Sequence, residues 1–208
     1  MLAPAAVRLQ AEQMAEAGRV LARAFQDDPI WTWVFPDAKE RASVLPWWME
    51  TSTRYCHLFG EVYTTSGPLF GAADWLTPGN THFPTDRLLA AGFGPMRERF
   101  GDGPYGRFMT MLATIQPLHE AAMPGPHHYL MTLGVDPPRQ GQGIGGALLQ
   151  PALAQADAEG LSCYLETETR EDVRFYLRHG FRVLVETVVP GGGPRIWTMS
   201  RLPQGLGR

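Results

Sequence analysis

The sequence predicts an α/β fold, and three observations carry that prediction. Strand-like apolar segments alternate with segments whose apolar residues recur at helical spacing. A glycine-rich run, Gly141 to Gly146, lies between the strand-like segment His127 to Val135 and a helix-like segment that Gly160 ends. The chain closes with two strand-like segments around a turn rich in proline and glycine, which is typical of an antiparallel hairpin.

Composition limits the class of protein. The 208 residues suit one domain with a sizeable core, and 44% hydrophobic with 19% charged residues is typical of a globular chain. Eighteen basic and twenty-one acidic residues give a net charge of −3, so we expect no nucleic-acid partner. The apolar runs are too short for a membrane span, which needs ~20 residues. Two cysteines, no disulfide framework and no leader-like start predict a cytoplasmic protein.

The N-terminal elements follow in order. Val7 to Leu9 is predicted as a short strand, and Ala11 to Phe25 as a helix because its apolar residues recur about every 3.6 positions. Asp27, Asp28 and Pro29 end that helix. A second helix is expected after Pro46, within an aromatic-rich stretch that we interpret mainly as core packing.

The middle of the chain contains one clear hairpin and a region that is harder to interpret. Glu61 to Thr65 and Leu69 to Trp75 flank the turn residues Ser66-Gly67-Pro68, so they are predicted to pair. Two helices are expected farther on, at Thr85 to Phe100 and at Tyr105 to Ala121.

The C-terminal elements are the best defined. Proline donates no ladder hydrogen bond, so Pro137 and Pro138 end the buried strand that begins at His127. Pro151 should bend the helix after the glycine run. The remaining elements are a strand at Ser162 to Thr167, a helix at Glu171 to His179 with a Thr169/Asp172 capping box, and a hairpin of Phe181 to Val189 with Arg195 to Ser200.

The glycine run indicates a phosphate-bearing cofactor, because closely spaced amides and a helix N-terminus attract phosphate oxygens. A nucleoside-triphosphate loop would need Lys and Ser or Thr after its last glycine, but Ala147 follows Gly146. Gly141, Gly143 and Gly146 do match the dinucleotide pattern G-x-G-x-x-G. Context argues against that match, because residues 136–140 separate the strand from the first glycine and too little chain follows for further βαβ units.

A third interpretation starts from Gln140-x-x-Gly143-x-Gly145, which follows the strand Tyr129 to Val135 and the turn Asp136-Pro137. This pattern resembles the coenzyme A diphosphate loop of the GNAT acetyltransferase superfamily, near its puromycin N-acetyltransferase-like bacterial branch. The resemblance extends to Tyr164 to Thr167, Val173 to Phe181 and Gly193 to Met199, and more weakly to Ala24 to Pro29 and Gly71 to Trp75. It implies one N-acetyltransferase domain over residues 1–208, with a mixed, mainly antiparallel sheet flanked by helices and splayed central parallel strands.

The resemblance also implies acetyl-CoA as the acyl donor. Leu133 and Val135 would bond the pantetheine arm in the gap between the parallel strands, with an N–H near Leu133 facing the thioester oxygen as a modest oxyanion hole. The amides of Gln142 to Gly146 would bind the diphosphate. Arg139 either pairs with a phosphate or is a solvated surface charge. The expected coenzyme A-binding residues are Leu133, Val135, Arg139, Gln140, Gly141, Gln142, Gly143, Ile144, Gly145 and Gly146.

Two residues are candidates for proton transfer. The resemblance places Tyr176 beside the coenzyme A sulfur as the acid that protonates the leaving thiolate, and the alternative is a core tyrosine that packs through its ring. Nothing acidic lies between Tyr129 and Val135, so Glu166, at the end of the next parallel strand, is the candidate base acting through water. Its alternative is a structural carboxylate.

The acceptor is predicted to be a primary amine on a small molecule. In the family, the region of Asp28, Trp31 and Trp33 lines the acceptor pocket, although Asp28-Pro29 is equally typical of a helix stop. A protein or peptide amine is the alternative acceptor, and a noncatalytic acyl-CoA-binding module is the alternative function. No metal is expected, because His127 and His128 would point to opposite strand faces. A homodimer is compatible with the family.

Overall fold

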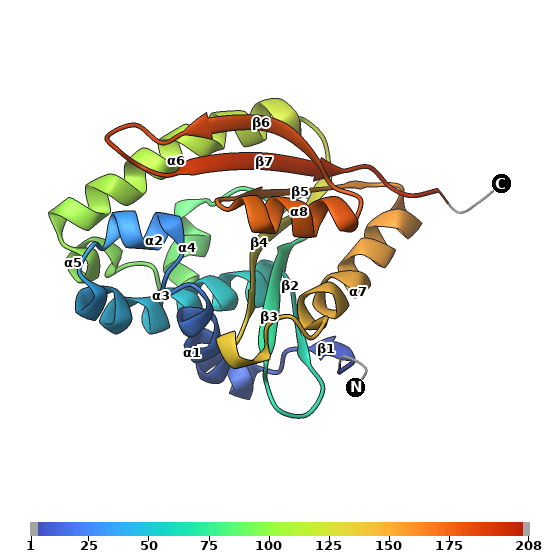
Figure 1. Cartoon of the computed structure of the whole chain (residues 1–208), viewed down its shortest axis with the longest axis horizontal. Coiled ribbons are helices and arrows are strands. Elements are labelled where there is room, and N and C mark those ends of the chain that lie inside the picture. The colour runs from blue at the N-terminus through green and yellow to red at the C-terminus, as the bar shows by residue number, and fades with distance from the viewer. Residues whose placement is uncertain (1–3, 206–208) are drawn as a thin grey trace.

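The computed structural model describes residues 4–205, so the first and last three residues of the predicted domain lie outside the described residues. The chain folds around a seven-stranded sheet in the order β1-β2-β3-β4-β5-β7-β6 (Figure 1). The pair β4–β5 is parallel, and the five other neighbouring pairs are antiparallel. The predicted α/β fold with a mixed, mainly antiparallel sheet is therefore confirmed.

The elements alternate along the chain as the sequence predicted. The strands are β1 (Ala6–Arg8), β2 (Gly60–Thr65), β3 (Gly71–Leu76), β4 (His127–Val135), β5 (Ser162–Thr167), β6 (Arg182–Val188) and β7 (Arg195–Arg201). The helices are α1 (Met14–Ala24), α2 (Pro29–Val34), α3 (Ala38–Phe59), α4 (Thr85–Ala91), α5 (Met96–Phe100), α6 (Asp102–Ala122), α7 (Ile144–Glu159) and α8 (Arg170–Arg178). Two 3₁₀ turns, η1 (Ala11–Gln13) and η2 (Pro137–Arg139), precede α1 and the glycine run.

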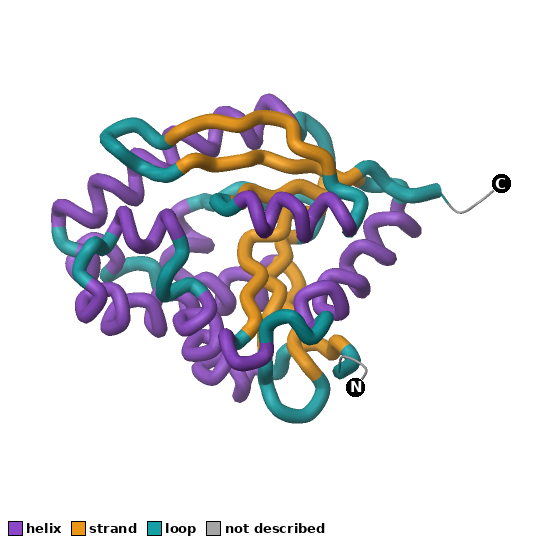
Figure 2. The backbone as a smooth tube through the Cα atoms, in the orientation of Figure 1, coloured by secondary structure: helices purple, strands orange, loops and turns teal. Residues whose placement is uncertain are grey.

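The parallel strands β4 and β5 separate soon after they meet. They pair only where residues 127–129 face residues 162–164, and β4 then continues to Val135 paired with β3 alone. In Figure 2, β2, β3 and β4 run steeply across the direction of β5, β7 and β6. The splay expected from the family resemblance is confirmed, and it opens the middle of the sheet.

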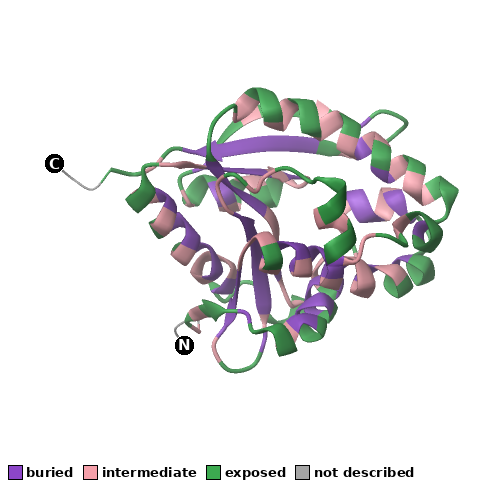
Figure 3. Ribbon diagram, turned by 180° about the vertical axis from the view of Figure 1, so that it is seen from behind, coloured by how far each residue is buried: buried purple, intermediate pink, exposed green. Residues whose placement is uncertain are grey.

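Helices cover both faces of the sheet, as Figures 1 and 3 show. One apolar cluster joins α1, α3 and α6 to the sheet and includes Leu21, Tyr55 and Tyr164. The other joins α7 and α8 to the opposite face and includes Leu148, Leu165 and Tyr176. Because the splay lies between these two layers, a passage through it connects the two faces.

The structure corrects two predicted helices and adds a third that was not predicted. The second predicted helix, α3, begins at Ala38 rather than after Pro46, because Asp37 accepts bonds from the amides of Lys39 (2.8 Å) and Glu40 (2.9 Å), and Pro46 lies inside the helix. The predicted helix Thr85 to Phe100 is two helices, since Gly92 adopts a left-handed φ of 104° that ends α4. The short helix α2 was not predicted, although Asp28-Pro29 is also a helix-start pattern.

Other local predictions are confirmed. Gly160 ends α7 with a left-handed φ of 68°, and the amide of Asp172 donates to the Thr169 hydroxyl at the start of α8. The closing hairpin of β6 and β7 is antiparallel. Among residues 4–205, no helix combines the length and apolar character that crossing a bilayer requires.

Close packing of α1 on α3 gives the first prediction. A Cβ at Gly18 of α1 would lie 2.7 Å from Glu50 Cβ and 2.9 Å from the Glu50 backbone on α3. We expect Gly18→Ala to lower the free energy of unfolding by about 1–3 kcal/mol, because the helices must move apart. The measurement is urea denaturation.

The matched control is Gly106→Ala in α6, where an added Cβ meets nothing within 4 Å. That exchange should raise the free energy of unfolding by about 0.5–1 kcal/mol through helix propensity. Equal stability of the two variants would show that Gly18 is not needed for helix contact.

Candidate active site

One cavity of ≈ 2090 Å³ passes through the splay and reaches both faces of the sheet. Ligand pockets usually measure about 300–1,000 Å³, so this volume suits two molecules that meet inside it. Its walls include the splayed part of β4, the glycine run and residues from α2, α3, α6 and α8. Most of the residues predicted for the site border this one space.

The glycine run forms an amide-rich wall of the cavity. Gly141 and Gly143 have φ values of 73° and 79°, which side-chain-bearing residues rarely adopt, and α7 begins immediately afterwards. A Cβ on Gly146 would lie 3.0 Å from the His179 ring, so the start of α7 packs closely on α8. The first amides of a helix have no partner inside it and attract anions. This wall therefore fits a diphosphate.

The longer side chains of the glycine run stabilise the loop. The amide of Gln140 donates to the Val135 carbonyl (3.1 Å), and that of Gln142 donates to the Pro138 carbonyl (3.4 Å). Arg139 extends over the Phe70 ring at 4.4 Å. Gln142 does not border the cavity, whereas Arg139, Gln140, Gly141, Gly143, Ile144, Gly145 and Gly146 do.

The splayed part of β4 offers a free backbone edge. Leu133 and Val135 border the cavity, and beyond Tyr129 the edge that faced β5 has no strand partner among the described residues. Residues two apart on a strand present their amides to the same edge. This edge therefore fits an extended ligand with amide groups, as expected for a pantetheine arm.

Tyr176 borders the cavity from the α8 side. It is 8% exposed, and its ring packs on Phe175 and Phe181 with centroids 5.1 and 5.7 Å away. Burial, together with nearby Asp172 and Glu168, holds the pKa of its phenol well above the ordinary value. Tyr176 thus packs as a core residue and also stays protonated at the cavity wall, which is the state a proton donor needs.

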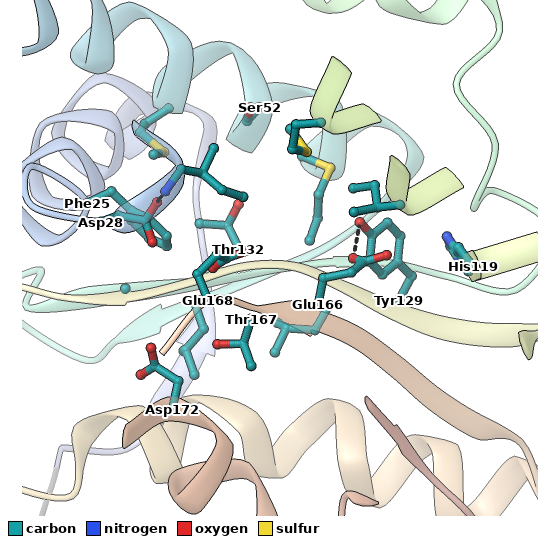
Figure 4. Close-up of a pocket in the computed structure, with 18 of the residues that line it drawn as sticks. Phe25, Asp28, Ser52, His119, Tyr129, Thr132, Glu166, Thr167, Glu168 and Asp172 are labelled. Atoms are coloured by element: carbon teal, nitrogen blue, oxygen red, sulfur yellow. Dashed lines mark hydrogen bonds between the residues drawn. The ribbon is translucent and has the colours of Figure 1, made fainter. Parts of the chain in front are cut away.

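Glu166 faces the cavity from β5, on the face that α6 covers. Its Oε2 accepts a hydrogen bond from the Tyr129 hydroxyl at 2.8 Å, while its buried Oε1 has no partner in the described structure (Figure 4). Burial raises the pKa of Glu166 to about 7. A carboxyl group with that pKa exchanges a proton readily near neutral pH.

Asp28 both starts a helix and borders the cavity, so its two predicted roles coexist. Its Oδ1 accepts from the amides of Ile30 (2.9 Å) and Trp31 (3.2 Å) at the N-terminus of α2. Burial raises the pKa of Asp28 to about 6, despite these two bonds. The site therefore holds a second carboxyl group that titrates near neutrality.

Of the two tryptophans predicted for the acceptor pocket, only one borders the cavity. Trp31 borders the cavity and packs among Trp48 and Phe108, with ring centroids 5.3 and 5.9 Å away. Trp33 is not among the residues that border it. Residues two apart on a helix point roughly 200° away from each other, so only one of them can face the cavity.

Several site residues were not predicted from the sequence. Glu168 and Asp172 border the cavity near Asp28, and burial raises the pKa of each carboxyl. Alternation along the strand offered a signal for Glu168, which follows Glu166 by two residues. His119 had no local signal, because only the packing of α6 on the sheet brings it to the cavity.

The adjacent histidines of β4 point to opposite faces, as predicted. His127 Nε2 lies 2.7 Å from His119 Nε2, whereas His128 Nε2 lies 2.8 Å from Glu159 Oε2 on the α7 face. Among the described residues, no three His, Cys, Asp or Glu side chains converge in a way that could hold a metal ion.

Comparisons with known proteins show a related family and fold. Residues 99–181 match the model of the acetyltransferase (GNAT) family. An uncharacterised N-acetyltransferase of Schizosaccharomyces pombe is 26% identical over 186 residues, covering 85% of this chain and 74% of that protein.

Solved structures share the fold over nearly the whole chain. The structure titled histone acetyltransferase HPA2 and related acetyltransferase, from Corynebacterium glutamicum, has a TM-score of 0.64 at 22% identity and covers 98% of each chain. Polyamine N-acetyltransferase of Drosophila melanogaster, which catalyses the formation of N-acetylagmatine, has a TM-score of 0.59 at 13% identity, covering 95% of this chain and 98% of its own.

The fold is the one that these acetyltransferase structures share. The resemblance seen in the sequence is confirmed to this extent: residues 99–181 match the GNAT family model, and the chain is similar to N-acetyltransferases in sequence and in fold.

The half-buried cap Asp28 gives a prediction about stability. Between pH 4 and its native pKa of about 6, the unfolded chain releases this proton while the native protein holds it, so wild-type stability falls as pH rises. Asn keeps a capping oxygen but cannot ionise. We expect the free energy of unfolding of Asp28→Asn, relative to wild type, to increase by up to ~1.4 kcal/mol per pH unit over this range and then level off.

Chemical denaturation at a series of pH values measures this difference. The same exchange at the exposed cap of α3, Asp37→Asn, is the matched control. An equal rise with pH in both variants would contradict burial of Asp28 as the cause.

Proposed function

We propose that this protein transfers an acetyl group from acetyl-CoA to the primary amine of a small molecule by direct attack on the thioester. The observation that carries the proposal is the single cavity that joins an amide-rich loop, on one face of the sheet, to a titratable carboxyl group on the other. Acetyl-CoA supplies an acyl group already activated as a thioester.

Backbone groups would hold the donor. The amides of Gln142 to Gly146 would bind its diphosphate, where the glycines allow close approach. The free edge of β4 at Leu133 and Val135 would bond its pantetheine amides. An N–H near Leu133 would stabilise negative charge as it develops on the thioester oxygen.

Glu166 would act as the general base. An amine attacks only when neutral, so its ammonium form must first lose a proton. The unpartnered Oε1 would accept that proton, directly or through a water molecule. With a pKa of about 7, Glu166 is substantially ionised at pH 7.5 and can perform this step.

Tyr176 would act as the general acid. Its phenol is protonated at neutral pH, as an ordinary tyrosine is, and burial keeps it so. It would donate that proton to the departing thiolate. Tyr176 belongs to the apolar cluster of α7 and α8, whereas Glu166 lines the cavity on the face that α6 covers. The proton would therefore be taken up on the acceptor face and supplied on the donor face.

The cavity lining favours a small amine with an apolar part. Trp31, Trp48, Phe108 and Met111 line the acceptor side, and the carboxyl groups of Asp28 and Glu168 lie near it. A carboxylate attracts an ammonium, and aromatic walls bury an apolar body. The fold neighbour that forms N-acetylagmatine acts on a small-molecule amine, which is consistent with this choice.

The kinetic prediction concerns the two proton-transfer residues. Tyr176→Phe and Glu166→Gln should each lower kcat about 10²–10⁴-fold, because each removes one proton-transfer group while preserving side-chain shape. Thiol release from acetyl-CoA over a panel of small amines and peptide amines is the assay. Tyr63→Phe, at a tyrosine on β2 that does not border the cavity, is a control that should retain activity.

Wild-type turnover by both variants would overturn the assigned roles. Acetylation of peptides alone would favour the protein or peptide acceptor.

Binding of the donor is tested separately from turnover. A concentration of coenzyme A that is 100 times Kd should stabilise the folded protein by about 2.7 kcal/mol, seen as a higher Tm. Binding without acetylation of any amine would favour a noncatalytic acyl-CoA-binding module. No rise in Tm at millimolar coenzyme A would contradict the proposed cofactor.

A further inference from the structure

A histidine of α6 packs on the point where the central strands part. The His119 ring stacks flat on Tyr164, with centroids 4.2 Å apart and an interplanar angle of 7°, and lies 4.6 Å from the Tyr129 ring. Tyr129 and Tyr164 are the last residue pair joining β4 to β5. Figure 4 shows His119 beside Tyr129, at the cavity wall near Glu166.

The hydrogen-bond pattern assigns one tautomer to His119. His127 Nδ1 lies 2.8 Å from the Gly125 carbonyl, which can only accept, so Nδ1 carries the hydrogen and His127 Nε2 is an acceptor. His119 Nε2, 2.7 Å away, must then be the donor. This arrangement holds while both rings are neutral, because a protonated His127 would donate from Nε2 and His119 would have to accept there in its other tautomer.

The surroundings keep both rings neutral. Burial, together with the neighbouring His127 and His82, lowers the pKa of His119 to about 4. Burial also lowers the pKa of His127. The groups facing this pair from the sheet are the phenols of Tyr129 and Tyr164, with Glu166 behind them. The hydrogen bond therefore persists through neutral pH.

His119 is connected to Glu166 through Tyr129, whose ring it contacts. The Tyr129 hydroxyl donates to Glu166 Oε2 at 2.8 Å, and this bond favours the ionised carboxylate. With Oε2 engaged, Oε1 is the oxygen left without a partner. The direction of the Tyr129 hydroxyl depends on where its ring is held, and His119 packs against that ring.

We propose that His119 is a positioning residue for Glu166. Fixed by His127, it holds the Tyr129 ring so that the phenol binds one oxygen of the Glu166 carboxylate and leaves the other oxygen for the acceptor amine. This inference rests on the proposed function, in which Glu166 is the base. In this proposal the two histidines act through Tyr129 and exchange no proton.

The pH dependence of kcat/KM distinguishes positioning from simple structural support. The Tyr129 hydrogen bond favours the ionised carboxylate, so its loss should raise the pKa of Glu166. The acid limb, meaning the rise of kcat/KM on the low-pH side of the profile, should then move to higher pH. Glu168, Tyr129 and Tyr164 are the other titratable groups near this carboxyl. The histidines are already neutral in this range.

The experiment compares four proteins: wild type, Tyr129→Phe, His119→Phe and the double variant. Phenylalanine keeps each ring while removing its polar atoms. Each single variant should shift the acid limb upward by about one pH unit. The double variant should shift it no further, because His119 acts through Tyr129, and KM for acetyl-CoA should stay at the wild-type value.

His128→Asn is the matched control. His128 is a buried histidine next to His127 on β4, but its side chain faces α7 and Glu159. It should leave the acid limb in place. If His119→Phe does not fold, His127→Phe breaks the same hydrogen bond from the other side. A wild-type limb in His119→Phe, or an added shift in the Tyr129→Phe background, overturns the inference.

Glu166→Gln separates failure of this inference from failure of the proposed function. Full activity of Glu166→Gln with its acid limb retained would show that Glu166 is not the base. Loss of the limb in Glu166→Gln, with no shift in His119→Phe, would leave the base in place and reject only the role of His119.

Discussion

The site depends on the early end of hydrogen bonding between β4 and β5. After Tyr129 the backbone edge of β4 has no strand partner among residues 4–205, while its other edge stays paired with β3. An unpaired buried edge is costly unless a ligand or solvent satisfies it. The same separation lets side chains from both faces of the sheet reach one cavity. An opening that would weaken an ordinary sheet thus creates the place where donor and acceptor meet.

Packing on the far half of β4 keeps this opening in place. A Cβ at Gly134 would lie 2.7 Å from Leu21 and 3.0 Å from Ala24, so α1 approaches the strand closely there. The β3–β4 register also shifts between Asp74 and Trp75, and such an irregularity bends a strand. The angle of β4 is therefore set by tertiary contacts along its whole length.

The electrostatics of the cavity follow from the same geometry. Its donor side presents free amides, which attract anions, and its acceptor side contains buried carboxyl groups. Burial raises the pKa of Asp28 and of Glu166 to about 6 and about 7, values far from those of exposed carboxyls. Residue types of ordinary reactivity become useful near neutral pH because the fold removes them from water.

Local chemistry made much of the fold and the donor side predictable from the sequence. The glycine run, the prolines after Val135, the cap at Thr169 and the strand pattern of β4 and β5 each act over a few residues, and each appears as expected. Predictions that needed longer-range information failed. Pro46 did not start α3, and Trp33 turned away from the cavity while Trp31 faced it. Helix packing and helix phase decided those positions.

The sequence by itself determined the α/β order of elements, the amide-rich loop and the identities of Glu166 and Tyr176 as candidates. The order of elements and the loop depend on backbone preferences that act close along the chain, whereas Tyr176 became a candidate through the resemblance of its motif to a known family. Only the tertiary structure decided which groups surround Glu166, since Tyr129, His119 and His127 come from β4 and α6. It also decided their protonation, because a pKa depends on burial and neighbours, and residues distant in sequence supply both.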